Sequence, residues 1–155
     1  MIDITIRPAR EDEYDEVARI WLETFESSGL PHSGAAPSVD DLRARIDREI
    51  TDGWELFVAS TGECIVGMLA LVVADKHLDQ LFVAPHCQGQ GVSRALLSFA
   101  REKMPDEIWL RAAIANLRAI RWYEREGFVK EREEVRTHWS GPRAYYRWKR
   151  STEPQ

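Results

Sequence analysis

The sequence predicts an α+β fold: a mixed, mostly antiparallel sheet with helices on both faces. Strand patterns joined by short turns occur before residue 76 and again at the C-terminal end, and strands joined this way are antiparallel. Between these hairpins, strand and helix patterns alternate, which is typical of βαβ units. The expected element order is β-α-α-β-β-β-α-β-α-β-β.

The N-terminal third begins with a strand and two helices. Isoleucines alternate with polar residues over 2–7, which predicts a half-buried strand. Over 10–27, apolar residues recur every three or four positions, which indicates an amphipathic helix. Residues 27–38 have loop composition. Ser38 is a typical N-cap for a second helix, which is expected to end near Gly53.

The middle of the chain contains a hairpin followed by a strand, a loop and a helix. Strands are predicted over 54–60 and 63–75, and Gly67 inside the second indicates a bulge or a close backbone approach. Residues 77–83 form the next strand, because apolar β-prone residues precede the strand-ending Pro85. We expect His77, Asp79, Leu81 and Val83 to share one face of this strand.

The last third returns to the alternation of strand and helix. The pattern predicts a strand over 107–113, a helix over 115–127, and two closing strands over 128–137 and 143–150 with a turn at 140–142. Gly127 is expected to end the helix.

Composition and length limit the class of protein. The 155 residues are 44% apolar and 30% charged, as in ordinary globular proteins. We expect residues 1–150 to form one domain and 151–155 a tail. No apolar run reaches the ~20 residues that span a bilayer, and the acidic N-terminus does not resemble a signal peptide. Cys64 and Cys87 lie far apart with no CxxC or Cys/His cluster, so we expect a reducing, cytoplasmic location and no structural metal. No membrane partner is expected.

Charge is distributed unevenly along the chain. Residues 1–80 carry 17 acidic and 7 basic side chains, whereas residues 111–150 carry 11 basic and 5 acidic ones. The basic part suits an anionic cofactor, and the acidic part favours a cationic substrate. Two solvated surfaces of opposite sign would give the same counts. Basic and acidic residues are interleaved over 130–136, so no nucleic-acid partner is expected.

The loop PHCQGQGVS, residues 85–93, has the features of an anion site. It carries two glycines and precedes a helical pattern, so free backbone N–H groups and the helix dipole would face a phosphate. No lysine follows Gly91, which excludes a P-loop. Arg94 stands where a dinucleotide fingerprint needs its third glycine or alanine. Glycines that serve a sharp turn alone remain an alternative.

The chain resembles the GNAT superfamily of acyl-CoA-dependent N-acetyltransferases in two linked motifs. Val83-Ala84-Pro85 followed by Gln88-Gly89-Gln90-Gly91-Val92-Ser93 matches the family's cofactor motif, except that Ser93 replaces glycine or alanine. The second motif is matched by Asn116, Ala119, Tyr123, Gly127 and Phe128. The resemblance implies acetyl-CoA as cosubstrate and a splay between the fourth and fifth strands that frees backbone groups for pantetheine. The cofactor-binding residues it implies are Leu81, Phe82, Val83, Gln88, Gly89, Gln90, Gly91, Val92, Ser93, Arg94, Asn116 and Ala119.

The same resemblance implies direct acetyl transfer to a primary amine of a small molecule or protein. It assigns Tyr123 as the acid that protonates the leaving thiolate, whereas the helical pattern alone would favour a packing role. Asp79 and His77 are candidates for the general base. Acceptor-site candidates, which packing would explain equally well, are Trp21, Phe25, Glu26, His32, His138, Trp139 and Tyr145.

Two questions stay open at this point. A catalytically silent CoA-binding sensor or interaction module is the alternative to an enzyme, because Ser93 departs from the motif and the base is unassigned. The last two strands, if exposed, would also allow a homodimer.

Overall fold

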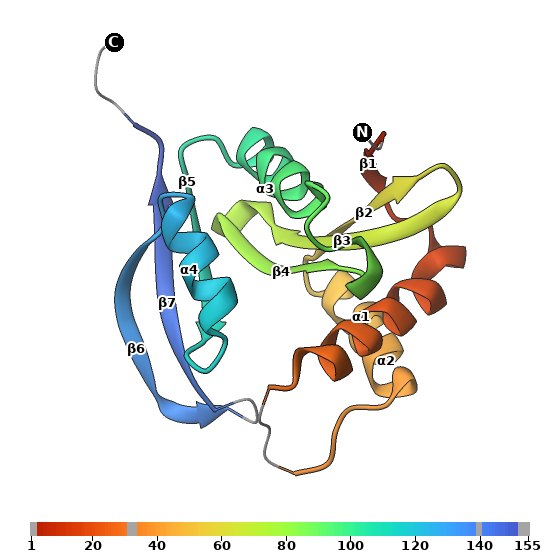
Figure 1. The fold of residues 1–155 in the computed structure, drawn as a ribbon, viewed down its shortest axis with the longest axis horizontal. Coiled ribbons are helices and arrows are strands. Elements are labelled where there is room, and N and C mark those ends of the chain that lie inside the picture. The colour runs from red at the N-terminus through yellow and green to blue at the C-terminus, as the bar shows by residue number, and fades with distance from the viewer. Residues whose placement is uncertain (1–2, 31–33, 139–140, 152–155) are drawn as a thin grey trace.

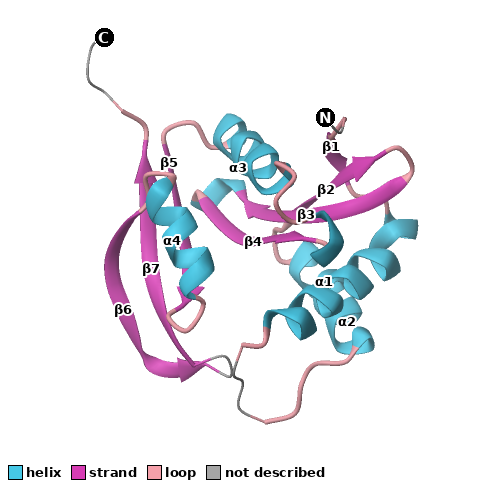
Figure 2. Cartoon of the chain, viewed as in Figure 1, coloured by secondary structure: helices cyan, strands magenta, loops and turns pink. Residues whose placement is uncertain are grey.

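The structure is a computed structural model that describes residues 3–30, 34–138 and 141–151, with the backbone alone for 135–138. Its strands are β1 (Thr5–Pro8), β2 (Glu55–Thr61), β3 (Cys64–Val72), β4 (His77–Val83), β5 (Glu107–Ala113), β6 (Val129–His138) and β7 (Gly141–Lys149). Its helices are α1 (Tyr14–Ser28), α2 (Val39–Thr51), α3 (Val92–Lys103) and α4 (Leu117–Arg125) (Figures 1 and 2). The predicted element order is therefore confirmed.

The strands form one sheet in the order β1-β2-β3-β4-β5-β7-β6. Neighbours are antiparallel except β4 and β5, which are parallel and pair at a single position, His77 with Trp109. Beyond this pair the two strands diverge (Figure 1). The sheet thus consists of a half β1–β4 and a half β5–β7–β6 that touch at one end, which is the predicted splay.

Helices cover both faces of the sheet. One core cluster joins α3 and Tyr123 of α4 to both halves of the sheet, including Val83, Leu110 and Tyr146. A second cluster packs α1 and α2 against β2 and β3. Among the described residues, no helix lies on the second face of β5–β7–β6, opposite α4 (Figures 1 and 2).

Local sequence signals explain several element ends. The Ser38 hydroxyl accepts from the Asp41 N–H at 3.1 Å, and the Asp41 carboxylate accepts from the Ser38 N–H at 2.9 Å, so the predicted cap of α2 is confirmed. A Cβ at Gly67 would lie 2.8 Å from the carbonyl oxygen of Phe82 and 3.2 Å from a Leu96 methyl carbon. Gly67 therefore permits the close approach of β3 to β4 and α3.

Three predicted boundaries were wrong. β3 ends at Val72, because residues 73–75 form a 3₁₀ turn that reverses the chain into β4. α4 starts at Leu117, because the Asn116 side chain caps it. β7 already includes Gly141 and Pro142, which were predicted as turn; Ser140 lies outside the described residues. Pro142 fits an early strand position, where its missing N–H does no harm.

A bulge in β4 resets the side-chain alternation. Leu78 pairs with Leu71 and Gln80 with Ala70, so Asp79 is an extra residue opposite β3. Leu81 and Val83 consequently pack in the α3-side cluster, whereas the Asp79 side chain bonds to Trp54 in the α1–α2 cluster. The expectation that His77, Asp79, Leu81 and Val83 share one face is wrong, since a strict period of two ignores the bulge.

Candidate active site

The divergence of β4 from β5 leaves backbone groups of β4 without a strand partner. The Ala84 N–H donates to the Val66 carbonyl of β3 at 2.8 Å. Because alternate residues of an antiparallel strand face opposite sides, Phe82 also bonds toward β3, and Leu81 and Val83 direct their peptide groups toward β5. The Val83 carbonyl accepts instead from Gln88 Nε2 at 3.3 Å and from Thr24 Oγ1 at 3.5 Å.

The glycine loop leads from this strand edge into the N-terminus of α3. Gly89 and Gly91 have φ of 82° and 88°, a left-handed conformation that favours glycine, and Gly91 is the N-cap. The first helical hydrogen bond runs from the Ala95 N–H to the Gly91 carbonyl at 3.1 Å. The N–H groups of Val92, Ser93 and Arg94 therefore have no acceptor inside the helix and point toward the loop. This arrangement can bind a phosphate.

Ser93 fits this loop without strain. It occupies the second position of α3, where the backbone has the right-handed helical conformation. A residue with a Cβ adopts this conformation without strain, whereas Gly91 has a positive φ. Its N–H stays available as a donor.

The second motif forms the start of α4. Asn116 Oδ1 accepts from the Ala119 N–H at 3.3 Å and so caps the helix. The Arg118 guanidinium donates to Gln88 Oε1 at 3.2 Å, which joins α4 to the glycine loop. Arg94 is exposed and lies 3.8 Å from Glu126, on the α4 side of the loop. The motif thus first serves to fix α4 beside the loop.

Tyr123 lies in the core cluster that spans the divergence of β4 and β5. Tyr123 is 8% exposed, and its ring packs edge-on against the Phe128 ring, with the two centroids 5.4 Å apart. Burial raises the pKa of the Tyr123 phenol above its usual value of about 10, because the phenolate would lose solvation. The hydroxyl is therefore protonated at neutral pH, as an acid for a leaving thiolate must be.

His77 and Asp79 form a buried polar group at the point where β4 and β5 meet. His77 Nδ1 donates to the Trp109 carbonyl at 3.2 Å, and its Nε2 lies 3.6 Å from Asp79 Oδ1. The imidazole stacks on the Trp109 ring at 3.7 Å. Asp79 Oδ2 accepts from Trp54 Nε1 at 2.7 Å. Burial opposes ionisation of Asp79, but His77, Trp54 and nearby Arg45 together lower the pKa of this carboxyl.

The predicted acceptor-site residues fall into three groups. Trp21 is buried between Trp54 and Phe82, with centroids at 6.0 and 5.6 Å, so it packs in the core, and its role at an acceptor site stays a prediction. Phe25 and Tyr145 are half-buried and Glu26 is exposed. His32 and Trp139 lie outside the described residues, and His138 is described by its backbone at the end of β6.

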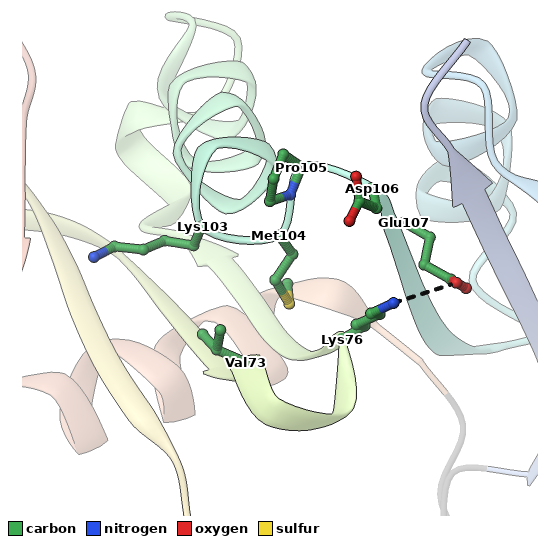
Figure 3. A pocket seen from close by; sticks show the side chains of 7 residues that line it. All are labelled: Val73, Lys76, Lys103, Met104, Pro105, Asp106 and Glu107. Carbon is green, nitrogen blue, oxygen red and sulfur yellow. Dashed lines mark ion pairs between the residues drawn. The ribbon is translucent and has the colours of Figure 1, made fainter. Parts of the chain in front are cut away.

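Two hollows in the described part of the surface lie away from the splay. A cavity of about 110 Å³ sits at the start of β4 and β5, where Lys76 pairs with Glu107 beside Met104 and Pro105 (Figure 3). A second, of about 320 Å³, is lined by residues of β6 and β7 that include Val129 and Arg147. Neither contains a residue of the two motifs apart from Gly127.

No group of three or more His, Cys, Asp and Glu side chains among the described residues could hold a metal ion. No helix in this part of the chain is long and apolar enough to cross a membrane.

Sequence reasoning missed four residues around this site. Trp54 and Thr24 reach β4 from other elements, and no sequence signal links them to it. Trp109 and Arg111 alternate with buried residues along β5. This alternation was the available signal that their side chains lie on the face of β5–β7–β6 opposite α4.

Comparison with known proteins agrees with this geometry. Residues 14–128 match the model of the "Acetyltransferase (GNAT) family". The chain is 28% identical over 141 residues to the peptidyl-lysine N-acetyltransferase YjaB of Escherichia coli, covering 85% of this chain and 87% of the relative.

Solved structures share the fold. The PaiA N-acetyltransferase from Thermoplasma acidophilum, solved with coenzyme A, superposes with a TM-score of 0.75 at 16% identity, covering 96% of this chain and 99% of that one. The spermidine N-acetyltransferase from Vibrio cholerae, solved with CoA and spermine, gives 0.70 at 19% identity, covering 95% of both chains. Because the family match spans most of the chain and includes both motifs, the protein belongs to the GNAT family of acetyltransferases.

Proposed function

We propose that this protein transfers an acetyl group from acetyl-CoA to a primary amine by direct attack of the amine on the thioester. The observation that carries the proposal is the single β4–β5 pair, which leaves the peptide groups of Leu81 and Val83 facing the splay. A pantetheine arm can bond to these groups as an added strand would. The loop N–H groups up to Arg94 would then hold the pyrophosphate.

The remaining motif residues complete the proposed cofactor site. Phe82 fixes the strand by bonding to β3, while Gln88 and the Asn116–Ala119 cap position the loop against α4. In this structure Gln88 Nε2 donates a hydrogen bond to the Val83 carbonyl, so a pantetheine N–H would take the place of Gln88 as the donor. Gly89, Gln90, Gly91, Val92, Ser93 and Arg94 supply the loop backbone around the phosphates.

For the chemistry, we propose Tyr123 as the acid and the Val83 N–H as the donor to the tetrahedral oxyanion. Asp79 is ionised at neutral pH and hydrogen-bonded, so it is suited to attract an ammonium group or to take its proton through water. His77 is held by Trp109 and faces Asp79.

Replacing Asp79 with Asn and His77 with Ala separates their roles through the acidic limb of the pH–rate profile. An unchanged limb in both would remove them as bases.

The deciding experiment measures thiol release from acetyl-CoA across an amine panel, with CoA binding measured beside it. Tyr123→Phe should lower kcat by about 100-fold or more while the Kd for CoA stays the same, because the acid acts on the leaving thiolate alone. Equal kcat in Tyr123→Phe and the parent protein would reject the acid role. Tight CoA binding with no amine acetylated would favour the silent CoA-binding module instead.

The acceptor and the assembly are the finer parts of the proposal. Named relatives act on peptidyl-lysine or spermidine. A cationic acceptor was predicted from the acidic part of the chain, residues 1–80, which includes Glu23, Glu26, Asp40 and Asp41. In the structure Glu23 pairs with Arg19, and Asp41 caps α2.

β6 forms the edge of the sheet, so a homodimer through this strand remains a hypothesis. A monomeric mass in sedimentation would reject it.

A further inference from the structure

The open face of β5–β7–β6 carries a row of aromatic and basic side chains. Arg111 of β5 pairs with Tyr145 of β7, and Tyr145 pairs with Arg132 of β6, so all three point to the face opposite α4. Trp109 lies one step along β5 on the same face. We call these four residues, Trp109, Arg111, Arg132 and Tyr145, the arginine–aromatic row.

The Tyr145 ring stacks on the Arg132 guanidinium, and the Arg111 guanidinium lies near two rings. The Arg132 guanidinium lies 3.6 Å from the Tyr145 centroid. Arg111 lies 5.9 Å from the Tyr145 and Trp109 centroids, and these two rings are nearly parallel at 5.9 Å. A guanidinium that stacks on a ring keeps its N–H edge free for a planar anion. The row is therefore preorganised for a carboxylate.

The two arginines of the row differ from their neighbours in their ion pairs with the described residues. On the same face, Arg143 pairs with Glu134, and Arg147 pairs with Glu131 and Glu107. Within the described residues, neither Arg111 nor Arg132 lies within ion-pair distance of a carboxylate. Two cations kept unpaired on one face of a sheet indicate a site for an external anion.

The row also lies close to the proposed chemistry. Trp109 forms the single β4–β5 pair with His77, and Arg111 lies two residues further along β5, where the strands have begun to diverge. His77 stacks on Trp109, and Asp79 faces the same side of the sheet as His77. An acceptor can thus reach from the row toward Asp79 and the exposed edge of β4.

Building on the proposed acetyltransferase function, we propose that the acceptor is a primary amine that also carries a carboxylate, of the amino-acid or short-peptide type. Arg132 and Arg111 bind its carboxylate, and Asp79 attracts its ammonium group. Opposite charges at the two ends fix the direction in which such an acceptor binds. A polyamine such as spermidine has no group for the two arginines and would be repelled by them.

The test compares free α-amino acids and dipeptides with their own carboxamides as acceptors in the thiol-release assay. Spermidine and a lysine peptide with blocked ends complete the panel. The parent protein should favour the acid over the amide. In Arg132→Gln and Arg111→Gln this preference in kcat/KM should fall about tenfold, the worth of one charge-assisted hydrogen bond. Differences in amine basicity cancel, because each variant meets the same pair of acceptors.

Two controls isolate the carboxylate contact. Arg48→Gln removes an exposed positive charge on α2 and should leave the preference unchanged. Arg132→Lys keeps the charge without the planar fork and should lie between the parent and Arg132→Gln. Faster turnover of spermidine or the lysine peptide, with an acid-to-amide ratio that neither arginine variant changes, would overturn the proposal. CoA binding without turnover of any amine would instead reject the acetyltransferase function on which it depends.

Discussion

At the scale of single residues, the glycine loop depends on backbone conformation more than on space. A Cβ at Gly91 would meet no atom within 4 Å, yet its φ of 88° is costly for any other residue. Gly91→Ala should therefore raise the Kd for CoA about tenfold through ~1–2 kcal/mol of strain. Ser93→Ala is the matched control and should stay within about twofold, because position 93 is helical. Calorimetric titration with CoA measures both. Equal losses in the two variants would show that the serine hydroxyl binds the cofactor.

At the scale of elements, the junction of β1 with α1 depends on one buried carboxylate. Arg7 donates to both oxygens of Glu13 at 2.8 and 2.7 Å, and the Arg10 N–H donates at 2.9 Å. The hydrogen bonds from Arg7 lower the pKa of Glu13 from 4.5 to about 2, against the effect of burial. A lowered folded-state pKa stabilises the fold above the unfolded-state value, and this stabilisation is lost as the pH falls from 4.5 toward 2.

Glu13→Gln should accordingly lower the free energy of unfolding by about 2 kcal/mol at pH 7, with the difference shrinking below pH 4.5. Urea unfolding at pH 7, 4 and 2.5 measures this change. Glu63→Gln, at the exposed β2–β3 turn, serves as the control and should change stability by less than about 0.5 kcal/mol at every pH. A pH-independent loss in Glu13→Gln would mean that packing, and not the ionised carboxylate, stabilises the junction.

At the scale of the whole molecule, two halves of a sheet meet at one residue pair, and cofactor binding should join them. The amides of Leu81 and Val83 face the splay, whereas the Phe82 amide faces β3. Residue-resolved hydrogen exchange should show Leu81 and Val83 slowed more than about tenfold by CoA, with Phe82 slow in both states. A uniform slowing across the sheet would instead report general stabilisation by a ligand that binds elsewhere.

Much of the fold followed from local patterns. Alternation, helical spacing and the Ser38 cap predicted the elements, and the two motifs predicted the family resemblance. Local patterns did not settle the points that a contact distant in sequence decides. Trp21 has the spacing of any helix residue that faces inward, and packing between Trp54 and Phe82 makes it part of the core. The bulge at Asp79 likewise depends on how β4 pairs with β3.

By itself, the sequence determined the order of elements, the glycine loop before α3 and the resemblance to the GNAT family, because periodicity, glycine placement and motif spacing are local properties. The tertiary structure decided which side chains meet. It set His77 against Asp79 and Trp109, and it placed Arg111 and Arg132 beside Tyr145 with no carboxylate partner in the described part of the chain. These contacts join residues up to 34 positions apart in the chain, from Arg111 to Tyr145. Strand register and the divergence of β4 from β5 bring them together, and no local pattern encodes either.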